Sequence, residues 1–229
     1  MIPFHEIANN SGYSISIQHI PTGRFVSFPC FLTQFSDDYS LNWSGESVYG
    51  RMDNIQTYKN TSRKLAIDFD VLAESEKRGE QNMIAVRELI RFLYPKYNKV
   101  DQQGFVRTLS APPLLKIKFA NLIESSTTGE GILGALSQFS YKPTHDSGYI
   151  MPKAGVIYAR AFSVSLSIDV LHDHDVGWNE ENNWLGGADF PYGLDSRQLQ
   201  AESSRTAGSS IGSDPSNPVN QSRVNTILK

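Results

Sequence analysis

Residues 161–170, with the sequence AFSVSLSIDV, alternate between apolar and polar side chains along their whole length. Successive side chains of a β-strand point to opposite faces, so the alternation predicts a strand with one apolar and one polar face. The apolar face needs a core, and the polar face needs water or a neighbouring molecule. The predicted inward residues are Phe162, Val164, Leu166, Ile168 and Val170, and the predicted outward residues are Ser163, Ser165, Ser167 and Asp169.

Other stretches share this period and extend the prediction to a mainly-β fold, a β-barrel or sandwich. Residues 25–36 predict two short strands separated at Pro29, because proline has no N–H for strand pairing. Residues 121–155 mix Gly, Ser, Thr and Pro and predict a hairpin with long connections around short strands. Further alternating stretches lie at residues 13–17, 65–71 and 114–119.

One segment, about residues 74–94, has the period of an amphipathic helix. Glutamates gather near its start, where the helix dipole favours anions, and Pro95 ends it. A single helix among many strands is expected to cover the open side of the barrel or sandwich. The apolar residues that define the helical period are Met83, Val86, Ile90 and Leu93.

The composition limits the possible partners. The 229 residues carry a net charge of −3 and no cluster of Lys and Arg, which argues against nucleic acid as the main partner. Cys30 is the single cysteine, so no internal disulfide can form. The sequence shows neither an apolar run of about 18 residues nor a signal peptide, so we expect no membrane partner and folding in the cytoplasm.

The chain divides near residue 195. Residues 1–195 carry the strand and helix patterns, whereas residues 196–229 contain no aromatic residue and are rich in Ser, Asn, Gly and Pro. Such a composition cannot offset the entropy cost of its own ordering. We therefore predict a β domain followed by an extended polar C-terminal arm, held by a neighbouring subunit.

The most enzyme-like stretch is LHDHDVGW, residues 171–178. Imidazole and carboxylate groups suit divalent metals, and a continuing strand would place His172 and His174 on one face. The remaining ligands would have to come from elsewhere, and a charged strand end running into a turn is the plainer interpretation. No nucleophile elbow or phosphate loop is present. The sequence therefore assigns no catalytic residue, no cofactor and no metal site.

Two segments are candidates for contacts between molecules. Residues 177–193 are aromatic and Gly-rich, with Trp178 and Trp184 just beyond the longest strand; a packed cap, a subunit contact and a ligand site all fit this pattern. Residues 47–53 form a polar knot before the strand at 65–71, and an active-site loop and a joint between subunits both fit it. The knot contains Tyr49, Gly50, Arg51 and Asp53.

The run from residue 42 to 71, the helix ending in LIRFLYPKY and the strand entry LSAPPLLKIKFANLI resemble phage and contractile-injection-system tail-tube proteins. The likeness is to the baseplate tube-initiator and hub-adaptor group and covers about residues 25–175. That group shows a Trp-containing strand, a Tyr/Phe-Gly-Arg-x-Asp-Pro-Ile turn and an alternating strand. Here Asn54 replaces the usual proline of the turn.

The resemblance implies a structural, non-enzymatic component of the virion tail or baseplate, assembled in the host cytoplasm. Six copies would form a ring that initiates or continues the tail tube, with tail tube and baseplate hub proteins as neighbours and phage DNA passing through the lumen. Two alternatives stay open: the tail tube subunit itself, and a metal-dependent hydrolase using His172 and His174. The subunit-interface candidates are Tyr49, Gly50, Arg51, Asp53, Trp178 and Trp184.

Overall fold

The computed structural model describes residues 13–99, 107–187 and 190–193. The predicted C-terminal arm, residues 196–229, lies outside the described residues. Within them, no helix is long and apolar enough to cross a membrane.

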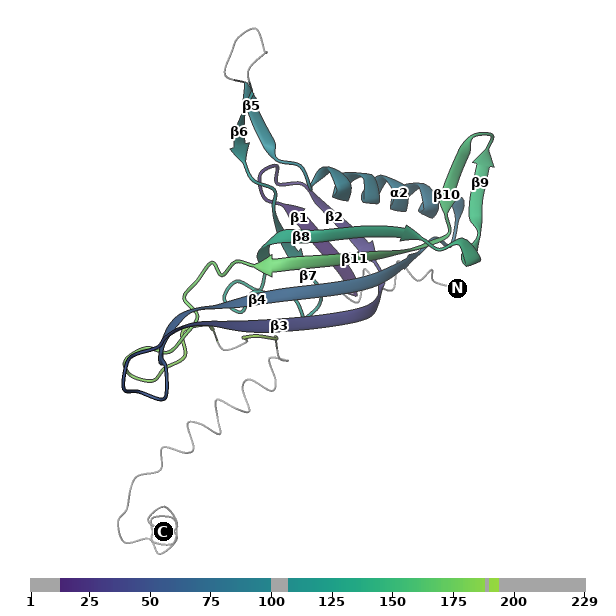
Figure 1. The fold of residues 1–229 in the computed structure, drawn as a ribbon. Coiled ribbons are helices and arrows are strands. Elements are labelled where there is room, and N and C mark those ends of the chain that lie inside the picture. Colours follow the sequence, from purple (N-terminus) through teal and green to yellow (C-terminus); the bar gives the residue numbers. More distant parts are fainter. Residues whose placement is uncertain (1–12, 100–106, 188–189, 194–229) are drawn as a thin grey trace, which may run out of the picture. The chain divides into compact units, whose positions relative to one another are not determined.

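Seven strands form one antiparallel sheet in the order β2-β1-β7-β8-β11-β4-β3 (Figure 1). Within the described residues, the prediction of a mainly-β fold with one α-helix is confirmed. In this order β2 and β3 are the two edge strands, although they follow each other in the chain. The strands are β1 (Ser14–His19), β2 (Phe25–Pro29), β3 (Phe31–Glu46), β4 (Ile55–Leu72), β7 (Leu114–Lys118), β8 (Ile132–Pro143) and β11 (Ala161–Val170).

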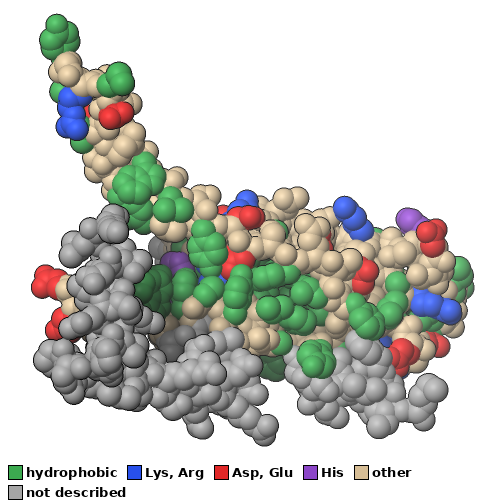
Figure 2. Space-filling model, turned by 90° about the horizontal axis from the view of Figure 1, so that it is seen from below, with side chains coloured by type: hydrophobic (Ala, Val, Ile, Leu, Met, Phe, Trp, Pro, Cys, Tyr) green, Lys and Arg blue, Asp and Glu red, His purple; other side chains and the backbone are tan. Residues whose placement is uncertain are grey.

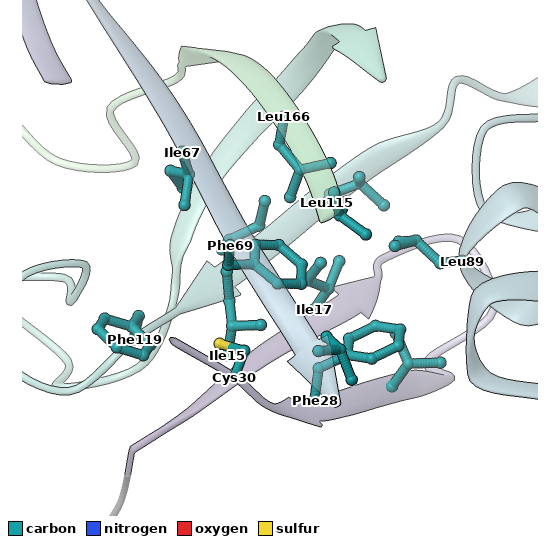
Figure 3. Close-up of a cluster of buried hydrophobic side chains, with 14 of the residues drawn as sticks. Ile15, Ile17, Phe28, Cys30, Ile67, Phe69, Leu89, Leu115, Phe119 and Leu166 are labelled. Carbon is teal, nitrogen blue, oxygen red and sulfur yellow. The ribbon is translucent and has the colours of Figure 1, made fainter. Parts of the chain in front are cut away.

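The sheet curls so that its two ends share one core. Phe28 on β2 and Phe69 on β4 lie 5.9 Å apart between ring centroids, yet four strands separate β2 from β4 in the sheet order. Strands are spaced about 4.8 Å apart, so a flat sheet would hold these rings more than 20 Å apart. The enclosed side chains include the fully buried Ile15, Ile17 and Leu115 (Figure 3). The core is therefore barrel-like.

The helix α2 (Glu76–Arg91) packs against β2 and the small β9–β10 hairpin (Figure 1). Ser75 caps it, because its hydroxyl accepts a hydrogen bond from the Arg78 N–H at 3.2 Å. The helix buries Gly79, Asn82, Val86 and Leu89, whereas Met83 and Ile90 are each 36% exposed. The predicted apolar stripe is therefore rotated: the Asn82 amide donates to the Leu72 carbonyl at 3.3 Å, and this bond turns a polar residue inward.

Three strands are longer than predicted. β3 has 16 residues, β4 has 18 and β8 has 12, where the sequence predicted short strands or only residues 65–71. Residues 55–62 of β4 are exposed throughout, so no buried face imposes alternation on them. Two further hairpins form separate two-stranded sheets: β5 (Lys96–Lys99) with β6 (Arg107–Ala111), and β9 (Tyr149–Lys153) with β10 (Val156–Ala159).

His19 makes the stability of the fold depend on pH. Its ring is 3% exposed, stacks on Phe92 at 5.2 Å and shares a 2.8 Å hydrogen bond with the Thr22 hydroxyl. Burial lowers the pKa of His19, so the unfolded chain binds protons more tightly at this residue. The free energy of unfolding is therefore expected to fall as the pH drops from about 7.5 to about 5.5, through the ordinary histidine range.

Urea denaturation at those two pH values checks this expectation. His19→Phe preserves the stacking and should reduce the pH dependence. Thr22→Val is the matched control, because it removes the hydrogen bond but keeps the titrating ring; it should lower stability at both pH values alike. An unchanged pH dependence in His19→Phe would contradict the assignment.

Candidate assembly surfaces

The hairpin of β3 and β4 extends beyond the core as an arm, residues 39–62. Its side chains are exposed along the length of both strands, including the large apolar residues Leu41 (60%) and Trp43 (55%). Figure 2 shows the arm as a narrow projection with hydrophobic side chains at its far end. Exposed apolar surface on a projecting element is typical of an interaction site.

The predicted polar knot is the tip of this arm. The Arg51 N–H donates to the Val48 carbonyl at 3.2 Å, and Gly50 has a φ of +82°, which favours glycine. Tyr49 and Met52 are fully exposed. In the described part of the chain neither Arg51 nor Asp53 makes an ion pair. The tip has no core contact and is free to meet another molecule.

A buried ion pair between β3 and β4 lies at the root of the arm, where the arm joins the core. Arg63 Nη2 lies 2.7 Å from Asp37 Oδ2 and Arg63 Nε lies 2.9 Å from Asp37 Oδ1; both side chains are 3% exposed. The Arg63 guanidinium also lies 5.4 Å from the Tyr39 ring centroid and 5.6 Å from that of Phe190. The pair is bidentate and enclosed by aromatic rings, which is the strong form of an arginine–carboxylate contact.

Residues 171–187 and 190–193 form a strap across this root. The Tyr192 hydroxyl donates to Asp37 Oδ2 at 3.0 Å, and the Tyr192 ring packs edge-on against Phe35. Burial and the Asp37 carboxylate raise the pKa of Tyr192, so the hydroxyl stays protonated as a donor. The sequence does not indicate this cluster, because a lone Asp and a lone Arg on two strands form no local motif.

The two tryptophan candidates lie in the strap. Trp178 and Trp184 pair across a short bridge with ring centroids 5.3 Å apart, and Trp184 also contacts Phe190. Trp178 is 70% exposed, whereas Trp184 is half-buried. The structure thus brings Trp184 to the root of the arm and leaves Trp178 at the surface, while the tip residues at positions 49–53 belong to a separate site.

A pocket of about 480 Å³ lies between the strap and the root of the arm. Its walls are largely aromatic, and a carboxylate stands at its margin. The arm contributes Tyr39, Tyr58 and Thr61, and the strap contributes His172, His174, Asp175, Val176, Gly177, Trp184 and Phe190.

The predicted histidine pair lies beside this pocket. β11 ends at Val170, so His172 and His174 do not continue the strand. His174 Nδ1 shares a 2.8 Å hydrogen bond with Asp173, and this bond lowers the pKa of the Asp173 carboxyl. The pKa of His172 is lowered by burial and by the positive charge of the nearby Arg63. In the described residues no group of three or more His, Cys, Asp or Glu side chains is arranged to hold a metal ion.

Polar side chains predominate on the outer face of β8, β11, β4 and β3, although Ser167 of β11 is buried. The predicted outward residues of β11 pair with Asp70, Asp68, Ala66 and Lys64 of β4. On the flanking strands the same rows contain Lys142, Ser140, Gln138 and Ala135 of β8, and Phe31, Gln34, Ser36 and Asp38 of β3. We call this surface the polar face. Its acidic members Asp38, Asp68, Asp70 and Asp169 outnumber Lys64 and Lys142.

No family model matches the chain, and no curated protein matches it. Among solved structures, the chain is similar to one in the cryo-EM structure of the anti-feeding prophage baseplate, symmetrised six-fold. The alignment covers 69% of this chain and 88% of that one, at 8% sequence identity and a TM-score of 0.29. The described residues thus define the protein by its own fold and surfaces: a mainly-β domain with the helix α2, a long edge hairpin and a polar sheet face.

Proposed function

We propose that this protein is a non-enzymatic structural component of a phage tail or contractile-injection baseplate. It forms a ring, of six copies, that initiates or continues the tail tube around a central channel. The observation that carries the proposal is strand β3, which pairs with β4 alone among the described strands and offers a long outer edge from Leu32 to Glu46. Such an edge is a template for pairing with another chain, and ring closure removes it.

The polar face fits the wall of a water-filled channel. Its serines, glutamines and aspartates interact well with water, and its excess of aspartate over lysine avoids tight binding of DNA phosphates. If the β3 edges join neighbouring subunits, these faces merge into one continuous inner surface. Phage DNA would then pass without being held.

The partners in this proposal are further copies of the chain, the tail tube protein and the baseplate hub proteins, within the virion. The long segment after residue 195 favours a specialised initiator or adaptor over the tube subunit itself.

Negative-stain electron microscopy of the purified protein, alone and with its tail tube partner, tests the proposal. Closed rings with a central hole, or rings that form only with the partner, are the expected result. Isolated monomers under both conditions would contradict a ring function. They would direct attention to His172 and His174, where elemental analysis for bound metal is the next measurement.

Arg51→Ala is expected to leave the monomer folded and to weaken ring formation or tube growth several-fold. The residue lies at the exposed tip of the arm and supports no core contact, so its loss should change the free energy of unfolding by no more than about 0.5 kcal/mol. Circular dichroism during thermal unfolding and particle counts by microscopy check the two parts. A mutant that unfolds as a monomer would instead show that the tip braces its own chain.

A further inference from the structure

We propose that the arm tip of one copy inserts into the pocket between strap and arm root of the next copy, with Met52 and Tyr49 as the buried side chains and Arg51 paired with Asp175 of the receiving copy. This inference rests on the proposed assembly function and names the contact that the arm makes.

The tip has the properties of a knob. Tyr49 is 105% and Met52 is 101% exposed, and both lie in the turn that joins β3 to β4. A large apolar side chain that is wholly exposed at a loop tip contributes nothing to its own fold. Met and Tyr are also well suited to contacts with other molecules, because a thioether adapts its shape and a Tyr ring offers an apolar body with one polar group.

The pocket has the matching properties of a socket. Its volume of about 480 Å³ lies within the range of sites that enclose small ligands, which leaves room for large side chains. Its aromatic lining, Tyr39, Tyr58, Trp184 and Phe190, favours a thioether, because sulfur–aromatic contacts stabilise by about 0.3–1.5 kcal/mol each. The buried pair of Arg63 and Asp37 and the hydroxyl of Tyr192 hold the strap in place beside it. The socket is thus formed before any partner arrives.

The charges of the two surfaces are complementary. Arg51 stands between Tyr49 and Met52 in the tip, and Asp175 lines the pocket and is exposed. In the described part of the chain neither residue has an ion-pair partner. A guanidinium carried in with the apolar knob would meet this carboxylate at the pocket margin, where water is partly excluded and the pairing is stronger than in bulk solvent.

The tip of a chain does not fill the pocket of the same chain. Tyr49 and Met52 are fully exposed, and they lie in the turn beyond β3, which ends at Glu46. The contact therefore joins two copies, and it uses different surfaces on each. Such a head-to-tail contact repeats from copy to copy and builds closed rings or longer stacks, according to the rotation between copies.

Cross-linking between two single-cysteine variants tests the contact. Met52→Cys and Val176→Cys proteins, full-length, are mixed under the conditions that give particles and treated with a short bis-maleimide. Val176 lines the pocket. Cys30 gives little background, because it is buried and its pKa is raised to about 11. We expect cross-linked dimers in the mixture and not with either variant alone. Met52→Cys mixed with Met151→Cys is the control, because Met151 is also exposed (70%) but lies on β9.

Charge reversal supplies the second test. Arg51→Asp and Asp175→Arg should each reduce particle formation by about tenfold or more, because like charges then meet across the contact. The double variant should recover most of the loss. Both residues are exposed, so the monomers should fold as before. This inference would be overturned if the unmodified protein forms rings but the two cysteine variants do not cross-link, or if the double variant does not recover ring formation. Either result would leave the proposed function standing. Absence of any particle in the unmodified protein with its partner would overturn both.

Discussion

Arg63→Met is expected to lower the free energy of unfolding by about 3–5 kcal/mol, because it leaves the Asp37 carboxylate buried without its cation. Asp37 then keeps only the hydroxyls of Tyr39 and Tyr192, at 3.1 and 3.0 Å, and both of its oxygens lie in a site where the side chain is 3% exposed. Because whole domains are stable by only about 5–15 kcal/mol, this single change should be plain in a urea melt.

The double variant Arg63→Met/Asp37→Leu is the matched control. It replaces both charges with apolar groups of similar size, and such exchanges of a complete ion pair are often neutral or stabilising. We expect it to recover most of the lost stability. Tyr192→Phe removes one hydrogen bond and should cost only about 0.5–1.5 kcal/mol. A loss below about 1 kcal/mol in Arg63→Met would show that water already reaches the pair.

Secondary structure is predicted best from the sequence where a single strand or helix has one buried face. The alternation at residues 161–170 predicted a strand with the same bounds as β11, because Phe162, Val164, Leu166 and Ile168 are all buried. The helix was also predicted, and Val86 of its predicted stripe is buried, but Met83 and Ile90 are exposed, since the inward turn of Asn82 depends on the carbonyl of Leu72 in a different element. Long-range polar contacts of this kind leave no periodic signal.

The arm and the ion pair at its root illustrate the same limit. Residues 55–62 are exposed on both faces, so their sequence does not alternate as a strand would. They form a strand because they pair with β3. Asp37 and Arg63 are 26 residues apart, and Tyr192 is 155 residues from Asp37. Only the fold brings these groups together. Residues 49–53 were predicted as a candidate joint from their turn chemistry, and the structure adds that they lie at the end of a projecting hairpin.

Removing the arm should abolish assembly and leave the domain folded. In the truncation, residues 42–60 are replaced by Asn-Gly, which favours the tight turn of a two-residue hairpin between Leu41 and Thr61. A second truncation that joins Ser40 to Ser62 covers the alternate hydrogen-bonding register. The deleted residues are nearly all exposed, and a shorter loop costs less entropy to close, so the free energy of unfolding should change by no more than about 1 kcal/mol.

Assembly should respond differently, because the truncation removes the tip knob, the exposed face with Trp43 and Tyr58, and part of the β3 edge at once. Sedimentation and microscopy should find monomers where the unmodified protein forms rings. Met151→Ser on the β9–β10 hairpin is the control, because it removes another exposed methionine that contributes nothing to the arm. If truncated and unmodified proteins form particles in equal yield, contacts elsewhere hold the subunits together, and the edge of β3 within the core domain becomes the place to look.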